Sequence, residues 1–187
     1  MRKSLSEMTL QELWELFPIQ LTEHNECWKD WYLEEQTFLL SFLAKTVRIY
    51  HIGSTAIHGI WAKPIIDILV EVPIKEHITI KNLLMQNCYV CMAQNETRID
   101  FNKGYTQDGF AERVFHLHLR EFGDNDELYF RDHLNENPAI AKAYEQLKLS
   151  LWKPFEHDRD GYTEQKTEFV RKYTQKAIEQ YGKERYS

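Results

Sequence analysis

The stretch HIGSTAIHGIWAKPIIDILVEV contains a turn of small residues that is suited to holding a phosphate group. Gly53 lets the backbone approach a ligand closely, and Ser54 and Thr55 offer hydroxyl and N–H groups to phosphate oxygens. Lys63 follows at the entrance of a β-rich run, where it supplies a point charge for the same anion. The order of these four residues predicts a phosphate-binding loop in front of a strand.

The β-rich run itself carries candidate metal ligands. In residues 64–72 the side chains alternate between two faces, which places Asp67, Leu69 and Glu71 together, opposite the branched apolar residues. Asp67 could bind Mg²⁺ or Mn²⁺, because such ions take oxygen ligands from one or two carboxylates and from substrate phosphates. Glu71, and Asp100 on another predicted strand, are the candidates for completing that metal site.

Two histidines lie two residues apart on a third predicted strand. His116 and His118 therefore project side by side, opposite the apolar residues of the same strand. With Asp67 and Asp100 they are our candidate catalytic residues, because histidines could orient an acceptor or take its proton near neutral pH. We add Arg113, near the start of this strand, to the candidate phosphate ligands. A solvent-exposed sheet face would give the same alternation, and that alternative stays open.

Two lysines interrupt the apolar stripes of the predicted C-terminal helices. Lys148 lies at helical spacing from Tyr144, and Lys166 lies at the same spacing from Tyr162. Lysines in such stripes either extend to water or face an acidic or phosphate-bearing cleft. On the second interpretation Lys148, Tyr162 and Lys166 contact a phosphorylated ligand from the helical side.

Hydrophobic periodicity predicts the elements that position these residues. Strands are expected at residues 46–52, 64–72, 89–94, 97–103 and 113–122. Helices are expected at residues 9–17, 19–44, 75–87, 126–136, 138–156 and 162–181, with Thr9 as an N-cap and Pro138 in a first turn. This order predicts an α+β fold in one domain, residues 1–187, with a mixed or mostly antiparallel sheet in about residues 1–123 and helices in about 124–187.

Composition limits the class of protein. Hydrophobic residues make up 43% of the 187 and aromatic residues 13%, which is typical of a globular protein. No apolar run approaches the roughly 20 residues of a membrane span, and no signal peptide is recognisable, so we expect a cytoplasmic protein. The net charge of −6 disfavours a nucleic-acid partner held by phosphate contacts.

The cysteines carry little functional signal. Cys88 and Cys91 have CxxC spacing, but no second pair or nearby histidine completes a zinc site. We expect all three cysteines, including Cys27, to be reduced, and the pair to be buried structural thiols. A redox or metal role for the pair is the alternative.

Taken in order, these motifs resemble the GrpB family. The HIGST turn, the glycine at position 59 and the Lys-Pro-Ile-Ile-Asp run match its pattern, and FHLHL matches its His-Leu-His strand. The segments FRDHL, AYEQLK and YTEQKTEFV resemble its C-terminal helices, so the similarity covers about residues 15–180. The resemblance implies a fold related to the nucleotidyltransferase superfamily, in which a Gly-Ser turn holds nucleotide phosphates and carboxylates bind Mg²⁺.

One position departs from the superfamily pattern, which places a second carboxylate two residues after the first. That position is Leu69 here, whereas two-metal phosphoryl transfer needs carboxylates that hold ions about 4 Å apart. Glu71, Asp100 or the histidines would have to complete the site. The leading hypothesis is a metal-dependent transferase acting on a nucleotide and a small acceptor. The alternatives are a non-catalytic module that binds a nucleotide or phosphorylated metabolite, and a metal-dependent phosphohydrolase.

Overall fold

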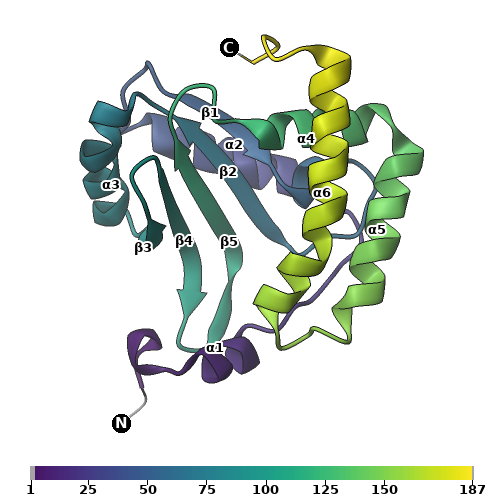
Figure 1. The fold of residues 1–187 in the computed structure, drawn as a ribbon. Coiled ribbons are helices and arrows are strands. Elements are labelled where there is room, and N and C mark those ends of the chain that lie inside the picture. Colours follow the sequence, from purple (N-terminus) through teal and green to yellow (C-terminus); the bar gives the residue numbers. More distant parts are fainter. Residues whose placement is uncertain (1–2, 187) are drawn as a thin grey trace.

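A five-stranded mixed sheet forms the centre of the computed structural model, which describes residues 3–186 (Figure 1). The strands lie in the order β1-β2-β5-β4-β3. Their bounds are Arg48–Ile52 (β1), Ile65–Glu71 (β2), Val90–Gln94 (β3), Arg98–Thr106 (β4) and Gly109–Arg120 (β5). The neighbours β2 and β5 run parallel, and the other neighbouring pairs are antiparallel. The predicted mixed sheet is therefore confirmed, with the strands that carry the predicted site at its centre.

Helices pack on both faces of the sheet (Figure 1). The helices α2 and α3 lie on one face, and α4 packs on the other against β1 and β2, with α5 and α6 packed beside α4. Their bounds, with the short N-terminal α1, are Leu10–Leu16 (α1), Cys27–Leu40 (α2), His77–Gln86 (α3), Asp126–Glu136 (α4), Pro138–Trp152 (α5) and Arg159–Tyr181 (α6). The α+β class, the N-terminal helices and the C-terminal helical region agree with the prediction.

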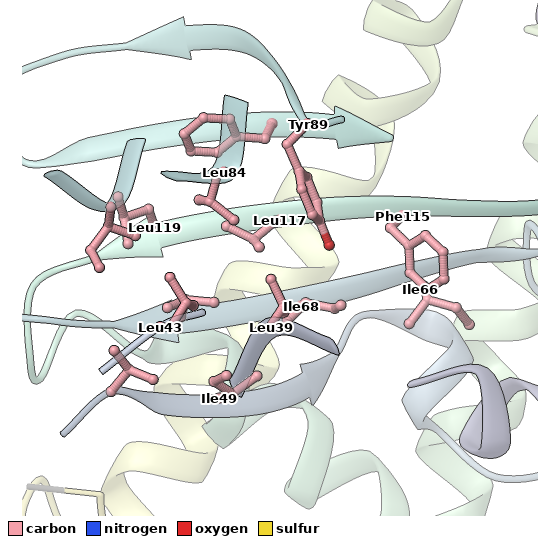
Figure 2. Close-up of a cluster of buried hydrophobic side chains, with 14 of the residues drawn as sticks. Leu39, Leu43, Ile49, Ile66, Ile68, Leu84, Tyr89, Phe115, Leu117 and Leu119 are labelled. Atoms are coloured by element: carbon pink, nitrogen blue, oxygen red, sulfur yellow. The ribbon is translucent and has the colours of Figure 1, made fainter. Parts of the chain in front are cut away.

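Side chains alternate between the two faces of each strand, and the apolar ones form the main core on the face covered by α2 and α3 (Figure 2). Ile66 and Ile68 of β2 and Leu117 of β5 are fully buried there, against Leu39 of α2 and Leu84 of α3. Each such side chain contributes about 1.5–3 kcal/mol by leaving water. This strong preference fixes the strand register, and it forces the intervening residues of β2 and β5 toward α5 and α6.

The long N-terminal helix begins later than predicted. Residues 19–26 are not helical, and α2 starts at Cys27. The backbone of this segment is paired elsewhere: Ile19 donates its N–H to Glu156 (2.8 Å), and Thr22 and Ala62 exchange two hydrogen bonds (2.9 and 3.0 Å). Tertiary pairing therefore overrides the helical pattern of these residues.

The helix α6 begins three residues earlier than predicted, and α5 ends at Trp152 instead of residue 156. The side chain of Asp158 caps α6 by accepting a hydrogen bond from the N–H of Gly161 (2.9 Å). Because the helix starts at this cap, Arg159 belongs to its first turn. The predicted cap at Thr9 and the proline at position 138 in a first turn are both confirmed.

The prediction of buried cysteines is wrong for this structure. Cys27 and Cys88 are exposed, Cys91 is partly exposed, and all three are free thiols. Cys88 adopts a φ of 67° in the turn between α3 and β3. None of the helices in residues 3–186 is both long and apolar enough to cross a membrane.

Candidate functional site

The glycine turn after β1 lies directly against the carboxyl group of Asp67. Gly53 has a φ of +71°, and a Cβ built on it would lie 2.8 Å from Cγ and 2.9 Å from Cβ of Asp67. Only glycine fits this approach, because any side chain would strain the backbone and displace the aspartate. Ser54 begins the short 3₁₀ turn that follows and lines the cleft beside Asp67.

Thr55 has a structural role in the same turn. Its side chain is buried, its hydroxyl donates to the carbonyl of Ile65 (3.2 Å), and it lies 3.0 Å from Nε2 of His51. These bonds fix the turn to the start of β2. The structure therefore does not present the Thr55 hydroxyl to a ligand, although the sequence made it a phosphate-binding candidate.

The parallel pairing of β2 with β5 brings the two predicted histidines to Asp67. Asp67 is the register partner of His116, and Leu69 is the partner of His118. Oδ1 of Asp67 lies 3.2 Å from Nδ1 of His116 and 3.8 Å from Nε2 of His118. Burial alone would raise the pKa of Asp67, but the histidine hydrogen bonds hold that pKa far below its ordinary value. Asp67 is therefore an ionised carboxylate at neutral pH.

The two histidines have different protonation states. Burial is the main cause that lowers the pKa of His116, and Tyr105 places its hydroxyl 2.8 Å from Nε2 of this ring. Burial would also lower the pKa of His118, but bonds to Asp100 and Asp67 outweigh it and raise the pKa to about 9. At neutral pH His116 is neutral, which suits a proton acceptor, and His118 is a cation.

Asp100 joins the network from β4. Its Oδ1 lies 2.8 Å from Nδ1 of His118 and 2.7 Å from a guanidinium nitrogen of the buried Arg120. Burial would raise the pKa of Asp100, but these two partners lower it to about 2. Asp67, Asp100, His116 and His118 thus form one connected group, as the sequence predicted.

Beside Asp67 lies a small cavity of about 260 Å³, which we call the basic lobe. Its polar lining is Ser54, Lys63, Asp67, His116, Lys148, Arg159, Tyr162, Thr163 and Lys166. Burial, followed by repulsion between the cations, lowers the pKa of Lys63 and of Lys148 to about 7. Burial lowers the pKa of Lys166 to about 8. Three lysines and one arginine therefore surround one carboxylate in a confined space.

The basic lobe opens into a second, larger cavity of about 690 Å³, which we call the wide lobe. Ser54, Asp67, Thr163 and Lys166 line both lobes, so the two are parts of one cleft. The wide lobe adds apolar side chains, among them Phe130 and Val170, and charged residues of α4 at its edge. A ligand could place a compact anionic group in the basic lobe and a larger group in the wide lobe.

The residues of the wide lobe, such as Phe130 and Val170, were mostly not among the sequence candidates, and three polar residues in or next to the basic lobe were also missed. Arg159 was missed because the helix that carries it was expected to begin at residue 162. Tyr105 was missed because the predicted strand ended at residue 103, whereas β4 continues to Thr106. Thr163, one residue after Tyr162, carries no motif of its own.

Two predicted site residues lie elsewhere. The guanidinium of Arg113 pairs with Glu34 of α2 and lies 5.6 Å from the ring of Trp31, on the face opposite the cleft. Arg113 and Phe115 are two residues apart in β5, so their side chains project from the same face of the sheet, opposite the cleft. Arg113 is therefore not a phosphate ligand in this structure.

Glu71 is also separated from the cleft. It shares a face with Asp67, but four residues of strand put it about 13 Å further along. Glu71 is fully buried, and its Oε1 accepts hydrogen bonds from the N–H of Gly123 (2.8 Å) and from Asn125 (3.0 Å). The carboxylate thus anchors the connection between β5 and α4 and cannot share an ion with Asp67.

The sequence and fold were compared with those of known proteins. The sequence model of the GrpB protein family matches residues 18–176. The chain belongs to the GrpB family. The glutamate-rich protein GrpB of Alkalihalophilus pseudofirmus is 36% identical over 158 residues, which cover 80% of this chain and 90% of that protein. YqkA of Bacillus subtilis is 32% identical over 170 residues, but this chain spans only 49% of its length.

Comparison with solved structures also identifies a GrpB protein. The crystal structure of GrpB from Enterococcus faecalis superimposes with a TM-score of 0.75 and 30% identity, over 87% of this chain and 99% of that one. The Cid1 poly(U) polymerase is a remote match with 9% identity and a TM-score of 0.47, too low to indicate an activity for this chain. GrpB membership thus agrees with the resemblance seen in the motifs.

The donor groups do not fit a two-metal site. Leu69 stands in place of a second carboxylate, and Glu71 is remote. Asp100 already pairs with His118 and Arg120, and Asp67 with both histidines. In the part of the chain that the structure describes, no three His, Cys, Asp or Glu side chains converge as they would around a metal ion. For the expected Mg²⁺ or Mn²⁺, the basic lobe therefore offers one candidate ligand, Asp67, which lies among lysine and arginine side chains.

Proposed function

We propose that this GrpB protein binds a nucleotide or another phosphorylated small molecule in the cleft between the sheet and helices α5 and α6. The observation that supports the proposal is the basic lobe, in which Lys63, Lys148, Arg159 and Lys166 surround the single carboxylate of Asp67. A phosphate group carries the negative charge that this arrangement lacks, and lysine and arginine are its usual protein ligands.

The energetics of the lysines favour an anionic ligand. Burial and mutual repulsion lower the pKa values of Lys63, Lys148 and Lys166 well below the ordinary value of a lysine, which destabilises the charged forms in the free protein. A stable fold does not require three buried lysines together, because apolar residues of similar size would pack there without the free-energy cost of burying charge. A bound phosphate would offset the repulsion and restore the charges.

The wide lobe suits the organic part of the ligand. Phe130, Tyr144 and Val170 give it an apolar wall, and Asp126 and Glu127 line its edge. An aromatic base could stack on the rings, and ribose hydroxyls could donate to the carboxylates. We therefore favour a nucleotide over a small phosphorylated metabolite.

Transfer of a phosphoryl or nucleotidyl group is a second candidate function. Asp67 lines both lobes, and the neutral ring of His116 is held beside it by Tyr105. A hydroxyl acceptor in the wide lobe could pass its proton to this pair while the basic lobe holds the phosphates. A metal-dependent phosphohydrolase has less support, because the metal donors are not gathered.

Thermal unfolding with a ligand series tests the binding proposal. ATP, ADP, AMP and adenosine share one base and differ in phosphate number. At a hundredfold excess over Kd, a ligand adds roughly 2.7 kcal/mol of stability, which raises Tm by roughly 5–10 °C for a chain of this size. We expect the shift to increase with phosphate number and to vanish for adenosine.

Matched lysine variants locate the site. Lys166→Met should reduce the ATP shift, whereas Lys172→Met, which changes an exposed lysine of the same helix, should leave it unchanged. Equal shifts for adenosine and ATP, or no shift for any phosphate compound, would show that the proposed function is wrong.

A further inference from the structure

The two carboxylates at and beside the basic lobe, Asp67 and Asp100, already have partners within the protein. Asp67 lies between His116 and His118, and Asp100 lies between His118 and Arg120. A divalent ion entering the cleft would have to compete with these partners for carboxylate oxygens. It would gain at most one carboxylate that faces the basic lobe, Asp67.

The cations of the basic lobe come from three separate elements, and two of them lie over the ring of one tyrosine. The Nζ atoms of Lys63, at the entrance of β2, and of Lys166, on α6, lie 5.1 and 4.4 Å from the ring centroid of Tyr162. The two ammonium groups are therefore no farther apart than the sum of those distances. Lys148 of α5 lines the same lobe, and Arg159 enters it from the first turn of α6.

A buried polar atom of a residue that lines the lobe also lacks a partner. Tyr162 is fully buried, and its hydroxyl has no hydrogen-bond partner within residues 3–186. A buried hydroxyl without a partner is costly, and such groups are rare in folded proteins. A phosphate oxygen in the lobe could accept from this hydroxyl while it contacts the lysines around the ring.

Positive charge in the lobe also opposes a metal ion. Lys63, Lys148, Arg159 and Lys166 outnumber Asp67, so a divalent cation would meet repulsion from those of the four that are charged. Phosphoryl-binding sites that use Mg²⁺ need the ion to neutralise the phosphates. Here side chains supply that charge, and a ligand phosphate with several negative charges needs no ion.

We infer that the basic lobe binds the phosphates of a polyphosphate ester, two or more phosphates long, without a divalent metal ion. This inference rests on the proposed phosphate-binding function and specifies the form of the ligand. It replaces the Mg²⁺ or Mn²⁺ expected from the superfamily resemblance with the chain's own lysines and arginine.

Isothermal titration calorimetry with ATP and with inorganic tripolyphosphate tests the inference, each in excess EDTA and in excess Mg²⁺. We expect Kd in EDTA to equal the Kd in Mg²⁺ or to be severalfold lower, because Mg²⁺ masks the phosphate charge. Binding that is tenfold or more tighter with Mg²⁺ would overturn the inference and leave the phosphate-binding function standing. No binding in either condition would refute the proposed function itself.

A charge variant gives a second, independent test. Asp67→Asn removes the one negative charge of the lobe but keeps an oxygen that can accept from the histidines. If the cations bind the phosphates alone, this variant binds ATP in EDTA severalfold more tightly than the wild type. If Asp67 binds an essential metal ion, the variant loses the affinity measured in Mg²⁺ tenfold or more.

Lysine variants complete the design. In EDTA, Lys166→Met should weaken ATP binding at least tenfold, and Lys172→Met should not change it. Cooperative urea unfolding of each variant confirms that a loss of affinity is not a loss of fold. Unchanged affinity of a folded Lys166→Met protein would contradict the inference.

Discussion

Replacing Gly53 by alanine tests whether the turn and Asp67 are fitted to each other. Gly59 supplies a matched control, because its φ of +69° is close to the +71° of Gly53. No atom lies within 4 Å of a Cβ built on Gly59, whereas a Cβ on Gly53 would overlap the carboxyl group of Asp67. The two substitutions therefore share a positive φ and differ in the clash with Asp67.

The magnitudes follow from the two causes. Placing alanine at a positive φ costs about 1–2 kcal/mol, partly offset by the lower entropy of the unfolded chain, so Gly59→Ala should cost about 1 kcal/mol. Gly53→Ala must also move Asp67 away from His116 and His118. Hydrogen bonds to a charged group contribute about 1.5–3 kcal/mol, so its total cost should be about 3 kcal/mol.

Urea unfolding of the two variants, followed by fluorescence of the five tryptophans, measures this difference. Repeating Gly53→Ala in an Asp67→Ala background removes the carboxyl group and leaves only the Cβ contact. The cost of Gly53→Ala should fall there by about 1–2 kcal/mol, which is the coupling energy of the pair. Equal costs for Gly53→Ala and Gly59→Ala, or no coupling with Asp67, would refute the fit between turn and aspartate.

Three further predictions concern charge and anchoring. Glu71→Ala should lower the free energy of unfolding by about 2 kcal/mol in urea, because it leaves the N–H of Gly123 unpaired, and should leave ATP affinity unchanged. The pKa of Lys148 is about 7 in the folded protein because of burial and the charge of Lys166, and Glu145 opposes this only in part. A lowered lysine pKa adds stability as pH rises from about 7 to 10, so the advantage of Lys148→Met over the wild type in urea should shrink by up to about 1 kcal/mol per pH unit. Finally, an anion that restores lysine charge must bring protons with it, so calorimetry of ATP binding at pH 8 in buffers of different ionisation enthalpy should report proton uptake; proton release would contradict the proposed site.

Much of the site could be predicted because strands impose a strict alternation. The parity of residues 67, 100, 116 and 118 determines their faces once the apolar positions are assigned, and the structure brings all four together. The same rule, applied to Arg113, would have placed it with Phe115 on the opposite face. Sequence reasoning could therefore have excluded that residue.

Other features depend on contacts that periodicity does not report. The parallel pairing of β2 with β5 decides that His116 is beside Asp67, and nothing in either strand alone specifies its neighbour. Arg159 enters the basic lobe only because Asp158 starts α6 earlier than the apolar pattern suggests. Residues 19–26 have a helical pattern but pair with distant segments, which no local rule predicts.

The parallel β2–β5 pair also affects how the protein is made. Asp67 leaves the ribosome 49 residues before its partner His116, and closing a loop of that length costs roughly 3 kcal/mol of chain entropy. Lys148, Arg159 and Lys166 are synthesised later still. A growing chain therefore displays Lys63 and Asp67 before the rest of the cleft, and a phosphate ligand bound as we propose would stabilise only a chain that already includes the later residues. A ligand with this property would select completely synthesised molecules over truncated ones.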